Sequence, residues 1–255
     1  MQAFTADDVM SETPHRQPSP KSRKPRRLWS WLWRVALLIV ALDAAYLVAV
    51  WPDWSVMRGA RHAKSNFIES YERQRAQDPR LPPLRWYPVA LNDVPAHLRQ
   101  AVIVAEDARF YQHDGFDFVA FTEAMTTNFE LGDFRYGAST ISQQTVKNMF
   151  FSGSRSLLRK WHELIVTLGM ELNVSKHRIL QTYLNVAEFG PGVYGVEAAA
   201  QHYWGIPVSA LNEQQAVELA ATLPSPLKDN PATRTTRFRN RVARIQSWLD
   251  VRNRP

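Results

Sequence analysis

The segment from Leu28 to Trp51 is almost entirely apolar, and it constrains the fold more than any other feature of the chain. Val35 to Val50 is interrupted only by Asp43, which we interpret as a tolerated polar residue in a single anchor. With residues 28–34 the segment exceeds the roughly 20 residues that a helix needs to cross a bilayer. Tryptophans stand at both ends, as is typical of the membrane–water interface. The sequence therefore predicts a transmembrane helix over residues 28–51.

A basic cluster immediately before this segment predicts its orientation. Five of the seven residues 21–27 are Lys or Arg, and the positive-inside rule keeps such a cluster in the cytoplasm. Residues 1–27 are then a cytoplasmic tail, and everything after residue 51 lies outside the cytoplasm. A cleaved signal peptide is disfavoured, because the basic region is long and no small-x-small cleavage site follows the apolar run.

Composition excludes several kinds of site in the outer part. The 255 residues include no cysteine, so disulfides, thiolate zinc sites and cysteine nucleophiles are excluded. Of 31 basic and 24 acidic residues, 7 and 3 precede Val35 and Asp43 lies in the span, which leaves 24 against 20 outside. This small excess fits contact with anionic lipid or diphosphate, whereas binding of nucleic acid is not expected outside the cytoplasm.

Apolar spacing beyond the anchor is mainly helical, and the scarcity of alternating Val, Ile and Thr argues against a large sheet. We expect a membrane-proximal connecting or jaw region over residues 52–90 and a mainly α domain over residues 91–255. The expected helices cover residues 95–114, 116–130, 140–150, 156–173, 176–187, 193–203 and 209–223, and a basic amphipathic helix lies within 233–255. The arginine-rich face of that last helix is most simply solvated, with anionic lipid as the lesser alternative.

Two adjacent carboxylates, Glu106 and Asp107, stand in the first of these predicted helices. The helix is expected to begin after a capping side chain near Pro95 and to end at Gly115, so that Glu106 and His113 share one face. The apolar run just before Glu106 places its carboxyl group at the edge of a core, where burial raises the pKa of a carboxyl and makes it a better base. An ordinary helix boundary explains the same residues, and the pattern by itself does not decide.

A second polar stretch, residues 137–148, begins the next predicted helix. Thr140 and Gln143 fit a capping box, and a helix start offers backbone N–H groups to an anion. The cap alone does not explain the density of polar donors that follows. We therefore favour a binding role, and the candidate residues in this stretch are Ser139, Gln143, Gln144, Lys147 and Asn148.

The helix predicted over residues 156–173 separates into two faces. Arg155, Arg159 and Glu163 form one row, and large apolar side chains lie on the opposite side. The charged row faces either solvent or a cleft, and an ordinary i,i+4 ion pair explains it as well. With Lys147 and Lys160, however, four cations fall within a short interval, and such groups suit a diphosphate leaving group.

Two familiar motifs are incomplete in this chain. His162-Glu163 begins a zinc-protease pattern, but Val166 stands where the second histidine would fall. Ser225-Pro226-Leu227-Lys228 matches the S-x-x-K of acyl-enzymes, but no K-T-G follows and fewer than thirty residues remain. Neither motif predicts a function.

Taken together, the polar stretches resemble the peptidoglycan glycosyltransferase family, and among its members the monofunctional biosynthetic transglycosylases. The matching motifs are Glu106-Asp107-x-x-Phe110-x-x-His113-x-Gly115, Gly137-x-Ser139-Thr140-Ile141-x-Gln143-Gln144-x-x-Lys147-Asn148, Arg159-Lys160-x-x-Glu163, Lys176-x-x-Ile179-Leu180-x-x-Tyr183-Leu184-Asn185 and Gly195-Val196-Glu197-Ala198-Ala199-Ala200. They occur in order over residues 90–225. Two positions depart from the pattern: Ser142 replaces a threonine and Gln181 replaces a glutamate, which puts a metal or helix-pairing role of position 181 in doubt.

The resemblance implies a lysozyme-like helical lobe with a small membrane-proximal jaw in the bacterial inner membrane, its catalytic domain in the periplasm. It implies polymerisation of lipid II onto a lipid-linked glycan strand in cell-wall biosynthesis, with inversion and release of undecaprenyl diphosphate. Glu106 would be the base and Glu163 the second acid, acting through orientation, charge or a metal. The implied substrate-binding residues are Lys147, Arg155, Arg159, Lys160, Ser139, Gln143, Gln144, Asn148 and Asp107.

The resemblance requires no covalent cofactor and we assign no metal ligand, although a magnesium ion would suit the diphosphate, and cell-wall or division proteins are candidate partners. Two other functions compete with this one. A lysozyme-like hydrolase or lytic transglycosylase also uses carboxylates in a helical lobe, but its glycan leaving group needs an acid rather than four cations. A membrane-anchored scaffold without activity explains the anchor but not the ordered motifs.

Overall fold

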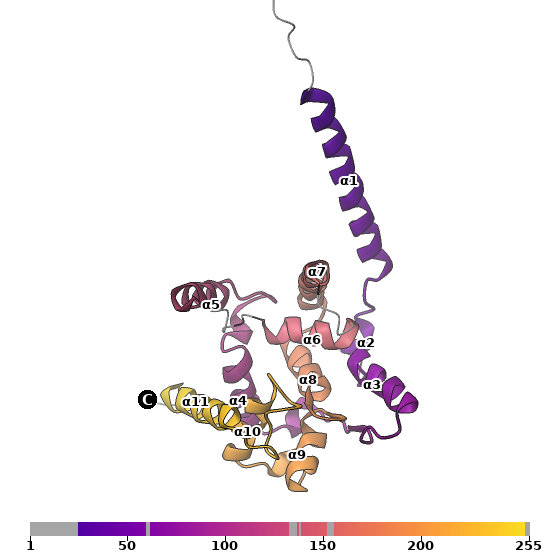
Figure 1. Cartoon of the computed structure of the whole chain (residues 1–255). Helices are drawn as coiled ribbons and strands as arrows, with labels where there is room; N and C mark the ends of the chain where they lie inside the picture. The colour runs from indigo at the N-terminus through magenta and orange to yellow at the C-terminus, as the bar shows by residue number, and fades with distance from the viewer. Residues whose placement is uncertain (1–24, 60–61, 133–136, 138, 152–155, 253–255) are drawn as a thin grey trace, which may run out of the picture. The chain divides into compact units, whose positions relative to one another are not determined.

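We describe a computed structural model of the chain, which covers residues 25–59, 62–132, 137, 139–151 and 156–252 (Figure 1). The chain divides into two compact units, Met1–Val50 and Trp51–Pro255. The described part of the first unit is helix α1, Pro25–Ala49. Within it the 21 residues Trp29–Ala49 are long and apolar enough to cross a membrane, and nearly all of their side chains are exposed. This helix agrees with the predicted anchor.

The second unit is mainly helical, as the apolar spacing predicts. Its α-helices are α2 (Ser55–Arg58), α3 (Asn66–Gln77), α4 (Ala96–Glu106), α5 (Phe118–Leu131), α6 (Ile141–Phe150), α7 (Leu157–Asn173), α8 (Lys176–Val186), α9 (Val196–Trp204), α10 (Glu213–Thr222) and α11 (Thr236–Arg252). Three short 3-10 helices are η1 (Leu91–Asp93), η2 (Phe110–Gln112) and η3 (Val208–Ala210). The described residues therefore confirm a mainly α fold.

The sheet found in the described residues is small. Strands β1 (Arg85–Trp86), β2 (Glu188–Gly190) and β3 (Val193–Tyr194) lie in the order β1-β3-β2. β1 runs parallel to β3, and β2 runs antiparallel to it with an irregularity between Glu188 and Gly190. The sheet ties the segment after α3 to the α8–α9 connection.

Two groups of helices form the core that positions the site. α4 packs against α10 and α11, and α6 packs against α7 and α8 (Figure 1). The apolar run Ala101–Val104 of α4 is buried, as are Ile141 and Val146 of α6. α4 ends at Glu106, next to Asp107, and α6 begins at Ile141, whose backbone N–H donates to Asp107. The two groups of helices therefore meet at these carboxylates.

The helix predicted over residues 95–114 begins where expected, because α4 starts at Ala96, but its predicted end is wrong. α4 is capped by Pro95 without a side-chain bond, because the polar residues before it form η1. It ends at Glu106, and Asp107 leaves helical geometry with φ −165° and ψ 74°. Glu106 and His113 therefore do not share one helix face. The contacts that hold Asp107 in this conformation come from distant parts of the chain and are described below.

The two faces of α7 are arranged opposite to those of an ordinary surface helix. Glu163 is only 2% exposed, whereas Leu157 is 92% and Leu172 is 87% exposed. The charged row therefore faces the protein interior, and the apolar row faces outward. Of the two orientations that the sequence allows, the structure shows the one in which the charges point inward.

Residues between the anchor and α4 pack on the rest of the second unit. Arg178 of α8 donates to the carbonyl oxygen of Met57 at 2.6 Å, and Trp54 and Met57 are buried. Gly169 of α7 accommodates Trp51, because a Cβ atom there would lie 2.5 Å from the Trp51 ring. The membrane-proximal role of residues 52–90 stays a prediction.

Candidate active site

Glu106 lies at the last position of α4, at the wall of a cavity of about 260 Å³. Gln144 of α6 donates from Nε2 to the Glu106 carboxylate at 2.7 Å. The Gln144 Oε1 atom accepts from the hydroxyl of Tyr183 at 3.0 Å, so Tyr183 fixes the amide with its nitrogen toward Glu106. A chain of three side chains from α4, α6 and α8 therefore holds the carboxyl group in place.

Burial raises the pKa of Glu106. The Gln144 hydrogen bond and the positive charges of Arg241 and Lys147 oppose this shift, and the neighbouring Asp107 adds to it. A carboxylate whose pKa is raised accepts a proton more readily than an ordinary carboxylate. These surroundings suit a general base.

The cations that the sequence singles out gather around Lys147 on α6. Burial lowers the pKa of Lys147, repulsion from Arg159 lowers it further, and attraction to Glu106 raises it. Lys160 has a lowered pKa through burial and repulsion from Lys147 and Arg159. Lys147 is therefore close enough to be attracted by Glu106 of α4 and repelled by Arg159 of α7.

Glu163 holds two of these cations. Arg159 forms an ion pair with it, and the Nζ atom of Lys160 lies 3.6 Å from its carboxylate. Lys160 also donates to the hydroxyl of Ser139 at 3.3 Å, and Ser139 lines the cavity beside Glu106. The Arg159 Nε atom is buried and makes no hydrogen bond within the described part of the chain. A buried donor of this kind suits an anion that enters the site.

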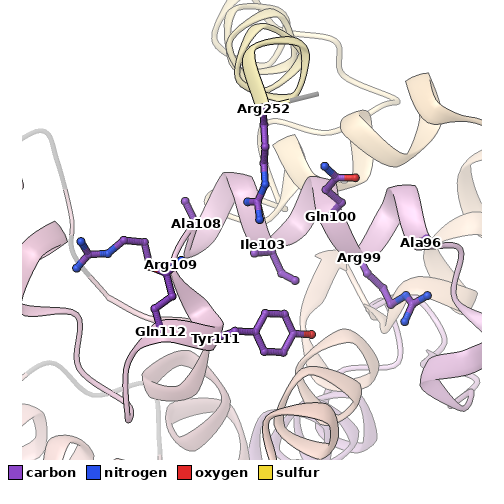
Figure 2. A pocket seen from close by; sticks show the side chains of 9 residues that line it. All are labelled: Ala96, Arg99, Gln100, Ile103, Ala108, Arg109, Tyr111, Gln112 and Arg252. Atoms are coloured by element: carbon purple, nitrogen blue, oxygen red, sulfur yellow. The ribbon is translucent and has the colours of Figure 1, made fainter. Parts of the chain in front are cut away.

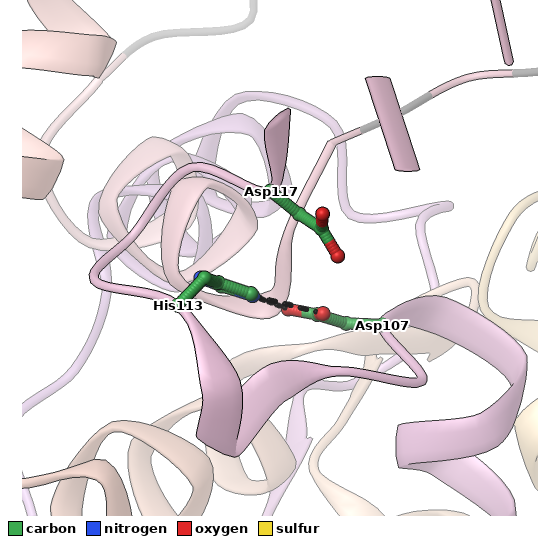
Figure 3. Close-up of side chains that lie close together, drawn as sticks. All are labelled: Asp107, His113 and Asp117. Atoms are coloured by element: carbon green, nitrogen blue, oxygen red, sulfur yellow. Dashed lines mark hydrogen bonds and ion pairs between the residues drawn. The ribbon is translucent and has the colours of Figure 1, made fainter. Parts of the chain in front are cut away.

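Asp107 connects its own segment to two others, and Figure 3 shows its bond with His113. It accepts from the backbone N–H of Ile141 at 2.9 Å and from His113 at 3.0 Å. His113 Nδ1 accepts from the N–H of Gly115, so its Nε2 carries the hydrogen that it donates to Asp107. Because Ile141 begins α6, Asp107 also stabilises the positive end of that helix.

Gly115 completes this connection through its backbone. Its φ is +95°, and a Cβ atom there would lie 2.9 Å from the Thr167 side chain. Its carbonyl oxygen accepts from the hydroxyl of Thr140 at 2.7 Å. Thr140 and Gln143 form the predicted capping box, which is confirmed. Gln143 is buried in this cap, so the cap accounts for its polar group.

Two predicted substrate-binding residues, Asn148 and Arg155, have no described contact with the site. Asn148 is partly buried on α6, and Arg155 lies outside the described residues. The structure therefore brings together Glu106, Gln144 and Lys147 and joins to them the group Arg159, Lys160, Glu163 and Ser139. Asp107 and Gln143 make hydrogen bonds that hold the fold, and their substrate-binding role stays a prediction.

Two residues of the site lie outside the predicted set. Tyr183 stands in a matched motif, but nothing in its position shows that it reaches Gln144. Arg241 of α11 interacts electrostatically with Glu106 and donates to the carbonyl oxygen of Ala221 at 2.7 Å. The prediction of a solvated arginine-rich face is therefore wrong for Arg241, which is partly buried because α11 packs against α4 and α10.

Comparison with known proteins identifies the family. A family model described as Transglycosylase matches residues 83–249. The chain belongs to the transglycosylase family. A biosynthetic peptidoglycan transglycosylase of Nitrosospira multiformis is 40% identical over 198 residues, which cover 77% of this chain and 85% of that protein. Relatives of the same name in Marinomonas sp. and Azoarcus sp. are 38% and 37% identical, over 88% and 89% of this chain and 88% and 99% of theirs.

The two departures from the family pattern are both accommodated in this transglycosylase. Gln181 is buried on α8, and its Oε1 accepts from the backbone N–H of Leu91 at 3.2 Å. A carboxylate could accept the same bond, so the amide keeps the docking of η1 without a buried charge. Ser142 donates its hydroxyl to Glu171, which also pairs with Lys176 at 2.7 Å. Both replacements are explained by contacts away from Glu106.

One cluster of this transglycosylase has metal-ligand residue types, namely Asp107, His113 and Asp117, whose ligand atoms lie within 4.8 Å of one another. Every one of these side chains already has a partner: Asp107 binds His113 and Ile141, and Asp117 binds Arg109 and the N–H of Ala120. Magnesium also prefers oxygen ligands over imidazole. The cluster does not fit a magnesium ion, and we assign it to folding.

We expect Asp107→Ala to destabilise the domain by about 2–4 kcal/mol, because the buried donors of His113 and Ile141 lose their acceptor. Thermal or urea unfolding in detergent measures this. Asp114→Ala removes an exposed carboxylate from the same segment and serves as the control. A variant at position 107 as stable as the control, yet inactive, would show instead that Asp107 contacts the substrate.

Proposed function

We propose that this chain polymerises lipid II into uncrosslinked glycan strands. The observation that carries the proposal is the pairing of a partly buried carboxylate, Glu106, with the neighbouring cation group around Lys147. A base is needed where a sugar hydroxyl attacks, and cations are needed where a diphosphate departs. The names of the relatives support peptidoglycan as the product.

In the proposed reaction, Glu106 acts on the acceptor lipid II and the cation group acts on the diphosphate of the lipid-linked strand. Glu106 accepts the proton of the hydroxyl on the acceptor lipid II, and the hydroxyl oxygen forms a bond to the anomeric carbon of the lipid-linked strand. The bond from that carbon to the diphosphate oxygen breaks, and undecaprenyl diphosphate leaves with the electron pair. Attack opposite the leaving group inverts the anomeric configuration.

Positive charge is the protein's contribution to the departure of the diphosphate. Lys147 interacts with both Glu106 and Arg159, so its ammonium group is placed to stabilise charge that develops on the leaving oxygen. Arg159 and Lys160 extend this positive region, and we propose the same role for Arg155. Ser139, Gln144 and Asn148 would then position sugar and phosphate oxygens.

Glu163 would act on the substrate through these cations. Its carboxylate is 2% exposed and paired with Arg159, which favours orientation and charge over direct contact. A magnesium ion, if one takes part, would arrive on the diphosphate oxygens as part of the substrate.

Exposed apolar side chains support contact of the second unit with lipid. They lie on α5 and α7 and include Phe118, Phe121, Phe129, Leu131, Leu157, Leu158, Trp161, Leu168 and Leu172. A lipid-linked substrate must be bound where its chain remains in the bilayer. We propose that these helices form a membrane-facing side of the catalytic unit. We also propose that the protein lies in the bacterial inner membrane with its N-terminus in the cytoplasm and that the catalytic unit faces the periplasm. Cell-wall or division proteins stay candidate partners.

The competing hydrolase would use the same carboxylates to cleave finished glycan. Its leaving group is a sugar hydroxyl, for which the cations around Lys147 have no use. Family membership also favours the transferase, and it sets aside the scaffold without activity.

The full chain in detergent with lipid II is expected to consume the lipid and form glycan polymer. Gel separation of labelled product measures polymer length, and the same preparation is incubated with finished peptidoglycan. Release of soluble fragments from the peptidoglycan without consumption of lipid II would overturn the proposal in favour of the hydrolase.

A further inference from the structure

A second cavity, of about 270 Å³, lies beside the candidate active site and is lined by arginine and amide side chains (Figure 2). Its walls come from α4, η2 and the end of α11. The nine lining residues are Ala96, Arg99, Gln100, Ile103, Ala108, Arg109, Tyr111, Gln112 and Arg252. These lining residues include three arginines and two glutamines but no acidic residue. The cavity therefore favours an anion.

The three arginines differ in whether their guanidinium groups already have an acidic or hydrogen-bonding partner. Arg109 turns away from the cavity in Figure 2 and forms an ion pair with Asp117. Arg99 contributes a buried Nε atom that makes no hydrogen bond within the described part of the chain. Arg252 reaches from α11 over Ile103 toward the same space. Because a buried donor without an acceptor is costly, Arg99 in particular calls for an anionic ligand.

The position of the cavity connects it to the reaction. Ala108 and Arg109 line both this cavity and the one that contains Glu106. A sugar whose hydroxyl lies at Glu106 would therefore hold its substituents within reach of the arginines. The cation group around Lys147 belongs to other elements, α6 and α7, so the two positive regions can serve different anions of one substrate.

We infer that this cavity binds the carboxylates of the stem peptide carried by lipid II or by the growing strand. The inference rests on the proposed function, because the stem peptide is the substituent of that substrate which carries free carboxylates. Guanidinium groups bind carboxylates through paired, charge-assisted hydrogen bonds, and the exposed Gln112 adds an amide donor.

The test uses two substrates. In one form of lipid II the carboxylates of the stem peptide are free, and in the other they are converted to amides. The full chain is expected to show a lower KM for the free carboxylates. The double variant Arg99→Gln, Arg252→Gln is expected to raise that KM about tenfold, which corresponds to about 1.4 kcal/mol, and to bring the ratio of the two KM values close to one. Arg239→Gln changes an exposed arginine of α11 outside both cavities and should keep the original ratio.

Two results would overturn the inference: equal KM values for the two substrates in the unmodified chain, or an equal rise for both substrates in the double variant. Calorimetry with a soluble stem peptide tests the site without catalysis. We expect the free peptide to bind the full chain and the double variant to lose this binding, while the amidated peptide binds neither. Failure to polymerise either substrate would contradict the proposed function, and peptide binding would still decide the site.

Discussion

Glu106→Gln is expected to lower polymerisation of lipid II by about 10²–10⁴-fold, the usual contribution of a positioned general base. Glutamine keeps the size of the side chain and a partner for Gln144, but it cannot accept the proton of the attacking hydroxyl. The initial rate of polymer formation measures the effect at saturating lipid II. Glu69→Gln, an exposed change on α3, is the matched control and should keep the original rate.

The thermal stability of the Glu106→Gln variant shows whether a lost rate comes from the missing base or from unfolding. Burial raises the pKa of Glu106 above its unfolded value, so the stability that protonated Glu106 contributes is present at low pH and lost as the pH rises through the folded pKa. A neutral amide lacks this pH dependence, and we expect the variant at neutral pH to unfold at the same temperature or a higher one. A stable variant that polymerises at the original rate would exclude Glu106 as the base.

The second large effect is expected for Lys147→Met, which should lower kcat by about 10²–10³-fold. Methionine fills similar space but offers no charge to the departing diphosphate. Because Lys147 also lowers the pKa of Glu106, its removal raises that pKa further and shifts the acid limb of the pH profile upward. The comparison is therefore made at a pH where both proteins have reached their maximal rate.

Controls at other lysines show whether the effect is specific to this position. Lys228→Met removes an exposed charge far along the chain and should leave kcat unchanged. Lys147→Arg keeps the charge and is expected to recover part of the rate. If methionine and arginine lower kcat equally while both proteins stay folded, charge at position 147 does not drive departure of the diphosphate.

Local signals in the chain predicted most of the helices correctly. The capping box of Thr140 and Gln143 depends on residues three apart, so the sequence contains all of it. The apolar spacing of α7 likewise showed its two faces. It could not show which face is buried, because that depends on α6, which lies outside the helix itself.

The end of α4 depended on contacts far away in the sequence. The Asp107 side chain meets Ile141, 34 positions later, and this bond competes with continued helix after Glu106. The surroundings of Glu106 also come from distant segments: Gln144 lies on α6, Tyr183 on α8 and Arg241 on α11. No spacing rule connects residues so far apart.

By itself the sequence determined the apolar N-terminal helix, the helical class of the remaining chain and the residue types of the chemistry, because each follows from a local pattern. Only the tertiary structure decided that Glu106 is the carboxylate with neighbouring cations and that Asp107 connects its segment to two others. The physical reason is that distant segments surround two adjacent carboxylates differently: the surroundings of Glu106 raise its pKa, whereas Asp107 receives hydrogen bonds from His113 and Ile141.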